Sequence, residues 1–213
     1  MEGLPKDRLS GQGDRGEPKN FSAVVVGGSA GGIQAVSRLV ADLPPDFPLP
    51  VVVVLHQHPD SSNYWYELLR SRTPLPVLEA LDKMPLTAGT IHCAPANYHL
   101  LLESDSSLAL SVDEKINFAR PSIDLLFSSA AEVFGPKLIG IILTGANNDG
   151  AQGLADIAAG GGIAIVQSPA NAEWPTMPAA ALMAAPAALS IDLEGIAAVL
   201  CELIRPEGKK CHG

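Results

Sequence analysis

The chain has 213 residues, of which 47% are hydrophobic and 17% are charged, and its formal net charge is −9. This length and apolar content fit one α/β domain with a sizeable core. The acidic balance, without any run of lysine or arginine, argues against nucleic acid as a partner and against binding to an anionic membrane surface. No apolar run reaches the roughly 18 residues that a membrane-spanning helix needs, so no direct membrane insertion is expected.

The cysteines and the chain ends bound the compartment and the domain. Cys93, Cys201 and Cys211 are scattered and odd in number, which favours a reducing compartment. The polar N-terminus is not a signal peptide, so we expect the cytoplasm. The composition predicts a disordered tail over residues 1–20, one domain over residues 21–205 and a polar tail over residues 206–213. No cofactor or metal is expected.

The first half of the chain alternates apolar strands with helices. We predict strands at Phe21–Gly28, Val51–Leu55 and Val77–Ala80, and helices at Gly32–Leu43 and Tyr64–Arg72, the second capped by Ser61 or Ser62. In the middle, the short runs Thr90–Ala94, Tyr98–Glu103 and Leu108–Val112 predict antiparallel hairpins. Pro121 is expected at the first position of a helix that runs to about Val133.

The second half repeats the same alternation. Strands are predicted at Leu138–Leu143, Ile163–Val166 and Ala188–Ile191, and helices at Asp149–Ala159, Met177–Ala184 and Leu193–Ile204. The whole pattern predicts an α/β fold: a doubly wound, mostly parallel sheet with helices on both faces and a small antiparallel hairpin insertion.

A glycine-rich turn follows the first strand. Gly27–Gly31 has the G-x-S-x-G spacing of a nucleophile elbow, with Ser29 as the candidate nucleophile. A phosphate-binding turn or plain turn chemistry are the alternatives. The dinucleotide spacing G-x-G-x-x-G and the Lys-Ser/Thr ending of a P-loop are both absent.

Two further residues complete a candidate catalytic triad. His56 and Asp149 lie, like Ser29, at or just past the ends of predicted central strands, which converge at one edge of a parallel sheet. A serine hydroxyl needs a base, and a carboxylate behind the histidine fixes its tautomer. His58 is a rival base, and Asp124 and Asp60 are rival carboxylates, while Asp149 also suits a helix cap.

The remaining histidines and tryptophans suggest structural roles. His92, His99 and His212 are expected to be structural or solvated, and Trp65 to be packed in the core. Trp174 lies in a proline-rich loop that can border a site.

From Ser22 to Leu200, the sequence resembles the catalytic domain of chemotaxis-type protein-glutamate methylesterases. The similar segments are Val25–Gly32, Val53–His56 with Pro59-Asp60 and Glu67–Leu69, Ala94-Pro95 with His99–Leu101, Arg120–Asp124, Leu143–Gly145 with Asp149–Gly153, and Gln167 with Met177-Pro178. An ordered series of motifs at compatible spacing is far more specific than the serine turn alone.

The resemblance implies Ser29 as nucleophile, His56 as base and Asp149 as its partner. It implies hydrolysis of glutamate γ-methyl esters on methylated chemoreceptor-type proteins, with release of methanol, and in some members deamidation of receptor glutamine. Backbone N–H groups near Ala30 and Ala146 are candidate oxyanion donors. Trp174 and Met177 are expected to line the site.

Several positions depart from the family's pattern. Ala30 stands where threonine is common, Ala146-Asn147-Asn148 where Met-Gly-Arg or similar is common, and Ser168-Pro169 where an acidic pair is frequent. The N-terminal phosphoacceptor domain of many members is replaced by residues 1–20, which leaves a separate regulatory protein as a possible partner. The alternatives are a weakly active or non-catalytic module that binds a signalling protein, and a nucleotide-binding domain that uses the glycine turn.

Overall fold

The computed structural model describes residues 20–57 and 64–205. Outside these ranges lie residues 1–19 and 206–213 of the predicted tails, the predicted caps Ser61 and Ser62, and the rival residues His58 and Asp60, as do Cys211 and His212.

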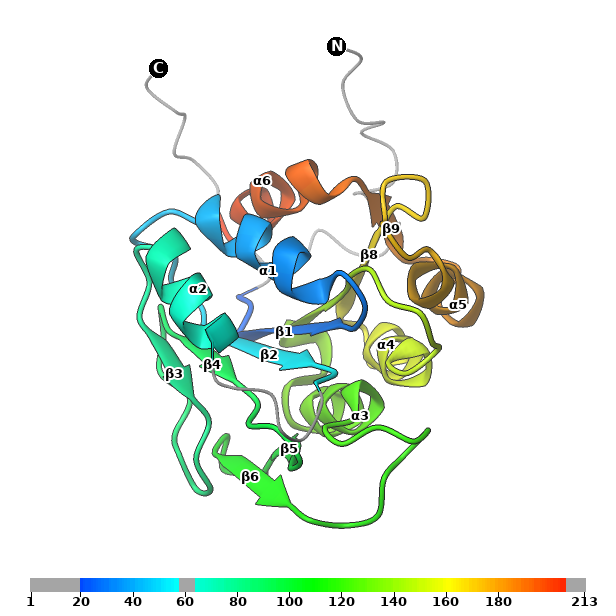
Figure 1. Ribbon diagram of the computed structural model, residues 1–213. Helices are drawn as coiled ribbons and strands as arrows, with labels where there is room; N and C mark the ends of the chain where they lie inside the picture. The colour runs from blue at the N-terminus through cyan, green and yellow to red at the C-terminus, as the bar shows by residue number, and fades with distance from the viewer. Residues whose placement is uncertain (1–19, 58–63, 206–213) are drawn as a thin grey trace.

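A seven-stranded sheet forms the centre of the molecule, and all of its pairings are parallel (Figure 1). The strand order is β3-β4-β2-β1-β7-β8-β9. The strands are β1 (Ala23–Gly28), β2 (Val51–Leu55), β3 (Val77–Glu79), β4 (Ile91–Cys93), β7 (Leu138–Ile142), β8 (Ile163–Gln167) and β9 (Leu189–Ile191). The predicted doubly wound, mostly parallel sheet is therefore confirmed.

The chain starts at the middle of this sheet and fills one side before the other. From β1 it moves outward through β2 to β3 and β4, and it later returns to place β7 on the opposite side of β1. The order of strands thus reverses at β1. In open α/β sheets, the crevice at the carboxyl ends of the strands beside such a reversal is where ligands bind.

Three helices cover each face of the sheet (Figure 1). On one face lie α1 (Gly32–Ala41), α2 (Tyr64–Arg72) and α6 (Leu193–Leu203). On the other lie α3 (Ile123–Phe134), α4 (Ala151–Ala159) and α5 (Thr176–Ala184), and a short 3₁₀ helix, Gly135–Lys137, links α3 to β7.

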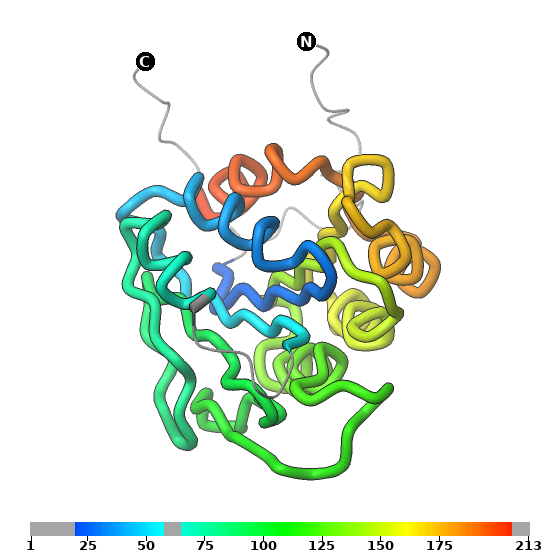
Figure 2. Tube along the Cα trace, in the orientation of Figure 1, coloured from blue at the N-terminus to red at the C-terminus, as the bar shows by residue number. Residues whose placement is uncertain are grey.

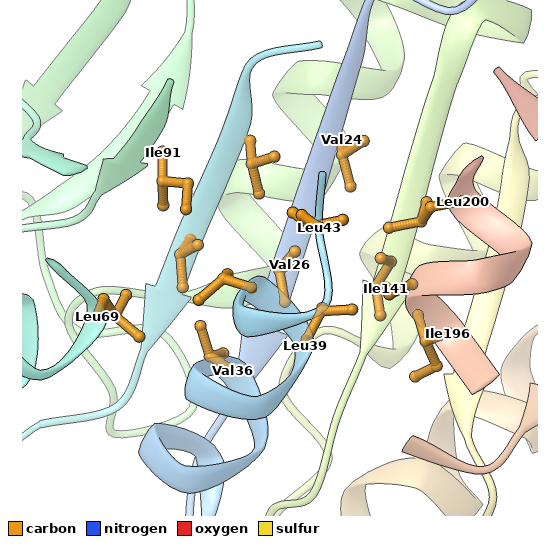
Figure 3. Packing of buried hydrophobic residues seen from close by; sticks show 14 of the residues in the cluster. Val24, Val26, Val36, Leu39, Leu43, Leu69, Ile91, Ile141, Ile196 and Leu200 are labelled. Atoms are coloured by element: carbon orange, nitrogen blue, oxygen red, sulfur yellow. The ribbon is translucent and has the colours of Figure 1, made fainter. Parts of the chain in front are cut away.

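Burial on both faces explains why the central strands are uninterrupted apolar runs. Val24 and Val26 of β1 point to the α1 side, where they pack with Leu39 of α1 and Ile196 of α6 (Figure 3). Val25, between them in sequence, joins the cluster on the opposite face. Successive side chains of a strand point to opposite faces, so a strand that is buried on both faces needs apolar residues at every position.

One prediction about the middle of the chain is wrong. Ile91–Cys93 does not belong to a hairpin but pairs in parallel with both β2 and β3 in the main sheet. The antiparallel hairpin contains only β5 (His99–Leu102) and β6 (Leu108–Ser111). A three-residue apolar run gives no local indication of the direction of its partner, which explains the error.

Two helix starts also differ from prediction. Pro121 does not occupy the first position of α3; Ser122 is the N-cap, and its hydroxyl accepts a hydrogen bond from the N–H of Leu125 at 3.4 Å. The following helix begins at Ala151 rather than at Asp149, because Gly150 forms its cap with a φ of 90°. That left-handed conformation is accessible to glycine, so Asp149 stays outside the helix and is available for other contacts.

In the part of the chain that the structure describes, every helix is too short or too polar to cross a bilayer.

The packing of α1 on the sheet leads to a stability prediction. Leu39 is 2% exposed. Replacing it by alanine leaves a cavity between α1 and β1, so Leu39→Ala should lower the free energy of unfolding by about 2–4 kcal/mol in urea denaturation. The control is the adjacent Arg38→Ala, which removes an exposed ion pair with Glu194 and should cost less than about 1 kcal/mol. Equal losses in the two variants would contradict this description of the core.

Candidate active site

Ser29 follows β1 directly and begins the tight turn into α1. Its N–H donates to the Thr144 carbonyl at 3.0 Å, and its own carbonyl accepts from the Gly32 N–H at 2.7 Å. Gly31 closes the turn with a φ of 74°, a left-handed conformation that suits glycine. The turn leaves Ser29 half-buried, just before the N-terminus of α1.

His56 lies beside this turn because of the strand register. Leu55 of β2 pairs with Gly28 of β1, so His56 and Ser29 are the next residues on two adjacent parallel strands. The N–H of His56 donates to the Gly28 carbonyl at 3.2 Å, which extends the pairing by one residue. In Figure 2, the turn after β1 (blue) and the end of β2 (cyan) lie near the middle of the view, and the loop between β7 and α4 (yellow-green) lies to their right.

Asp149 is completely buried and accepts hydrogen bonds from His56 and from the start of α3. The His56 Nε2 lies 2.7 Å from Asp149 Oδ2. The other donors are the Ile123 N–H at 2.7 Å, the Ser122 hydroxyl at 2.9 Å and the Asp124 N–H at 3.1 Å. Asp149 therefore caps α3 rather than its own helix, and the positive end of the α3 dipole faces its charge.

These donors decide the charge of the buried carboxyl. Burial alone would raise the pKa of Asp149, but the hydrogen bonds from His56, Ile123 and Asp124 outweigh it and bring the pKa below its ordinary value. Asp149 is consequently ionised at neutral pH, and an ionised carboxylate can only accept hydrogen bonds. The proton between Nε2 and Oδ2 therefore belongs to His56.

The second ring nitrogen of His56 faces Asn147. Asn147 Nδ2 is 3.0 Å from His56 Nδ1, and Asn147 Oδ1 accepts the Asp149 N–H at 3.1 Å. Because Oδ1 is used as an acceptor, Nδ2 points to the ring and donates to Nδ1. In the serine-protease template, Nδ1 faces the aspartate and Nε2 the serine. Here the nitrogens exchange roles: Nε2 carries the proton, and Nδ1 carries the lone pair that accepts from Asn147.

The backbone beside Ser29 offers candidate oxyanion donors. Within residues 20–57 and 64–205, no hydrogen bond uses the N–H of Ala30 or that of Ala146. Ala30 follows Ser29 in the turn, and Ala146 is exposed at the start of the loop after Gly145. Two unpaired N–H groups of this kind can stabilise a negative oxygen that develops near the serine.

Trp174 and Met177 differ in how they meet the site. The Trp174 backbone holds the Ser29 turn through Thr144: its N–H donates to the Thr144 hydroxyl at 2.8 Å, and that hydroxyl lies 3.1 Å from the Ala30 carbonyl. Trp174 is 47% exposed. Met177 is buried, and its N–H donates to the Gly145 carbonyl at 2.9 Å. This hydrogen bond ties the start of α5 to the loop between β7 and α4.

The rival carboxylate Asp124 has a different environment. Its Oδ1 accepts the Gly153 N–H at 2.8 Å, and the structure shows no hydrogen bond between its side chain and His56. Burial raises the pKa of Asp124 to about 6, the Gly153 N–H opposes the rise, and the charge of Asp149 adds to it. The structure thus brings His56 together with Asp149 and not with Asp124.

His92 and His99 have structural environments, as expected. His99 is buried; its Nδ1 accepts the Ser122 N–H at 3.1 Å, and its Nε2 lies 3.0 Å from the Glu114 carbonyl. The Thr87 N–H donates to Nε2 of the buried His92 at 3.2 Å. Nothing in the local pattern around Ser122 or Asn147 indicated a role at the site, because their contacts to Asp149 and His56 are long-range.

For the described residues, no group of three His, Cys, Asp or Glu side chains is arranged to hold a metal ion.

Comparison with known proteins assigns the family. A sequence profile described as CheB methylesterase matches residues 24–200. The chain belongs to the CheB methylesterase family. The crystal structure of the Thermotoga maritima CheB methylesterase catalytic domain is similar to 86% of this chain over 99% of its own length, with a TM-score of 0.82 and 31% identity.

Two curated relatives agree with this assignment. A putative protein-glutamate methylesterase/protein-glutamine glutaminase of Leptospira interrogans is 44% identical over 184 residues, which cover 86% of this chain and 95% of the relative. Protein-glutamate methylesterase FrzG of Myxococcus xanthus is 34% identical over 187 residues, which cover 88% of this chain and 56% of the relative.

The environment of Asp124 leads to a prediction of pH-dependent stability. Its pKa of about 6 in the native state exceeds the value near 3.9 of an unfolded chain. Between about pH 4 and pH 6, the native protein keeps a proton that the unfolded chain releases, so the stability from this group is lost as pH rises through that window. Asp124→Asn keeps an oxygen for the Gly153 N–H but removes the charge beside Asp149.

We expect Asp124→Asn to raise the free energy of unfolding at pH 8 by about 1 kcal/mol after allowance for solvent screening. The gain should shrink toward zero at pH 4, as measured by urea denaturation across pH. Asp46→Asn changes an exposed carboxylate and serves as the control. A gain for Asp124→Asn that does not vary with pH would contradict the assignment of this titration.

Proposed function

We propose that this chain is a serine hydrolase that removes methyl groups from glutamate γ-methyl esters of chemoreceptor-type proteins, with Ser29, His56 and Asp149 as its triad. The observation that carries the proposal is the 2.7 Å contact between His56 Nε2 and the buried Asp149 carboxylate, on the strand next to Ser29. This contact fixes the tautomer of the histidine and leaves Nδ1 as the base, at the end of the sheet where the serine lies.

The first half of the reaction forms an acyl-enzyme. Ser29 Oγ attacks the ester carbonyl carbon, and its proton passes to Nδ1 of His56. The resulting imidazolium is stabilised by the Asp149 carboxylate on Nε2. The bond from carbon to methoxy oxygen then breaks, His56 returns the proton to that oxygen, and methanol leaves. The glutamyl group remains bound to Ser29 as an ester.

The second half restores the enzyme. Water attacks the acyl carbon, His56 Nδ1 takes its proton, and the bond to Ser29 Oγ breaks as the proton returns to the serine. The product is a glutamate side chain. Deamidation of glutamine, an activity in the name of the Leptospira relative, follows the same steps with ammonia as the leaving group.

Negative charge develops on the carbonyl oxygen in both halves. The unpaired N–H groups of Ala30 and Ala146 are the donors we assign to it. The Ala30 N–H lies at the N-terminus of α1, whose dipole favours the same charge. Trp174, exposed at the rim, is positioned to contact the protein segment that carries the methyl ester.

The compartment and the regulatory partner remain part of this proposal. Cys93 and Cys201 are free thiols, which supports the cytoplasm as the compartment. A separate regulatory protein stays a prediction. A module that only binds a signalling protein is less well supported, because binding alone does not require a histidine fixed by a buried carboxylate.

The proposal predicts the effect of removing the nucleophile. Ser29→Ala should lower methanol release from methylated receptor by at least about a thousandfold, because the covalent intermediate cannot form. Ser190→Ala, which changes an exposed serine of β9, is the matched control and should retain full activity.

A fluorophosphonate probe should label the wild type at Ser29. Binding of receptor without labelling or methanol release would favour the non-catalytic module, and specific nucleotide binding would favour the third alternative.

The two neighbouring histidines should differ in their effect. His56→Ala removes the group that contacts Asp149, so methanol release should fall by several orders of magnitude. His58→Ala should retain most of the activity. The comparison requires both variants to fold with wild-type circular dichroism, and similar losses in the two would contradict the assignment of His56 as the base.

A further inference from the structure

The side chain of Asn147 contacts the ring nitrogen with which His56 would act as the base. Its Nδ2 is 3.0 Å from His56 Nδ1. Within the described residues, the hydrogen bonds of the His56 ring go to Asp149 and Asn147, and none goes to Ser29 Oγ. In this state, therefore, the amide of Asn147, and not the serine hydroxyl, faces the nitrogen that would accept the serine's proton.

The direction of this hydrogen bond is fixed by the other end of the amide. Asn147 Oδ1 accepts the Asp149 N–H at 3.1 Å, so the NH₂ group must face the ring. A ring nitrogen that receives an N–H must itself carry no proton. Turning the ring over would exchange both nitrogens for carbons and lose the contacts to Asp149 and Asn147 together.

The two partners of His56 consequently favour opposite charge states. The Asp149 carboxylate accepts from Nε2 and stabilises the imidazolium. The Asn147 amide donates to Nδ1 and can do so only while the ring is neutral, because both nitrogens of an imidazolium carry protons. Protonation of the ring would set an N–H on Nδ1 against the amide N–H of Asn147.

We infer that Asn147 is a positioning residue that holds His56 as the neutral Nε2–H tautomer and releases Nδ1 to the Ser29 hydroxyl during the reaction. This inference rests on the proposed function for its second part. Nδ1 has one lone pair in the ring plane, so the amide and the hydroxyl compete for it. Asn147 is half-buried, whereas Asp149 is fully buried, so the amide is the partner with room to move.

Other groups near the ring also influence its titration, and the variants leave them unchanged. Asp149 is hydrogen-bonded to Nε2, Asp124 in the first turn of α3 donates its N–H to Asp149, and the Glu173 carboxylate lies beside Gly31. His99 accepts the Ser122 N–H, and the Ser122 hydroxyl in turn donates to Asp149. Differences between the variants and the wild type therefore report on the amide.

Two substitutions separate the hydrogen bond from the shape of the side chain. Asn147→Ala removes the donor. Asn147→Asp has almost the same shape and keeps an oxygen for the Asp149 N–H, but it presents a carboxylate to Nδ1. Asn148→Ala changes the exposed neighbour in the same loop and is the matched control.

The test is a ¹⁵N NMR titration of the His56 ring in the intact protein, with His56→Ala used to assign the signals. We expect the neutral wild-type ring to carry its proton on Nε2. Losing the donor, or facing a carboxylate, favours the charged ring, so protonation of the ring should begin at higher pH in Asn147→Ala than in the wild type, and at higher pH still in Asn147→Asp. Asn148→Ala should behave as the wild type.

Activity gives a second and separate readout. The acidic limb of kcat/KM for p-nitrophenyl acetate should move to higher pH in step with the NMR value. A wild-type ring protonated on Nδ1 in its neutral form would overturn the inference, even if no Asn147 variant folded. So would equal pKa values in the wild type and both Asn147 variants. Loss of activity in Ser29→Ala with no shift in these titrations would leave the esterase standing and remove the role of Asn147.

Discussion

A carboxylate that folding removes from water organises the candidate site. Burying an ionised carboxyl without partners costs several kcal/mol, so its donors must be in place when it is buried. Asp149 takes them from two parts of the molecule: the start of α3 and the ring of His56. The packing of α3 against the β7–α4 loop and the orientation of the histidine therefore depend on the same carboxylate.

The sheet supplies the rest of the geometry. Because β1 is central and the chain reverses its direction of filling there, the ends of β2, β1 and β7 are adjacent. The residues after those strands are His56 and Ser29, followed after a loop by Asp149. Left-handed glycines make the two turns possible: Gly31 closes the turn after Ser29, and Gly150 keeps Asp149 out of α4. The parallel order of the strands brings Ser29, His56 and Asp149 to the same end of the sheet, and the two glycines shape the turns that hold Ser29 and Asp149.

The sequence was informative where burial acts locally. Continuous apolar runs predicted β1, β2 and β7. Because Ser29, His56 and Asp149 lie at or just past the ends of these strands, the sequence also predicted that they converge. It was uninformative where contacts are distant. The direction of Ile91–Cys93 depends on β2 and β3, and the donors to Asp149 come from a helix start more than twenty residues away. Asn147 was noted only as a departure from a family pattern, because a hydrogen bond to His56 leaves no trace in neighbouring residues.

A general base must be neutral before the reaction and charged during it, and the two nitrogens of His56 meet those needs separately. The partner of Nε2 is Asp149, which is fully buried and held by the backbone of α3. It can stabilise the charged ring without moving, and reorganisation there would cost rate. The partner of Nδ1 favours the neutral ring and must leave. Asn147 and Asp149 lie in the same loop between β7 and α4, but the Asn147 side chain is half-buried whereas Asp149 is fully buried, so moving Asn147 disturbs less packing.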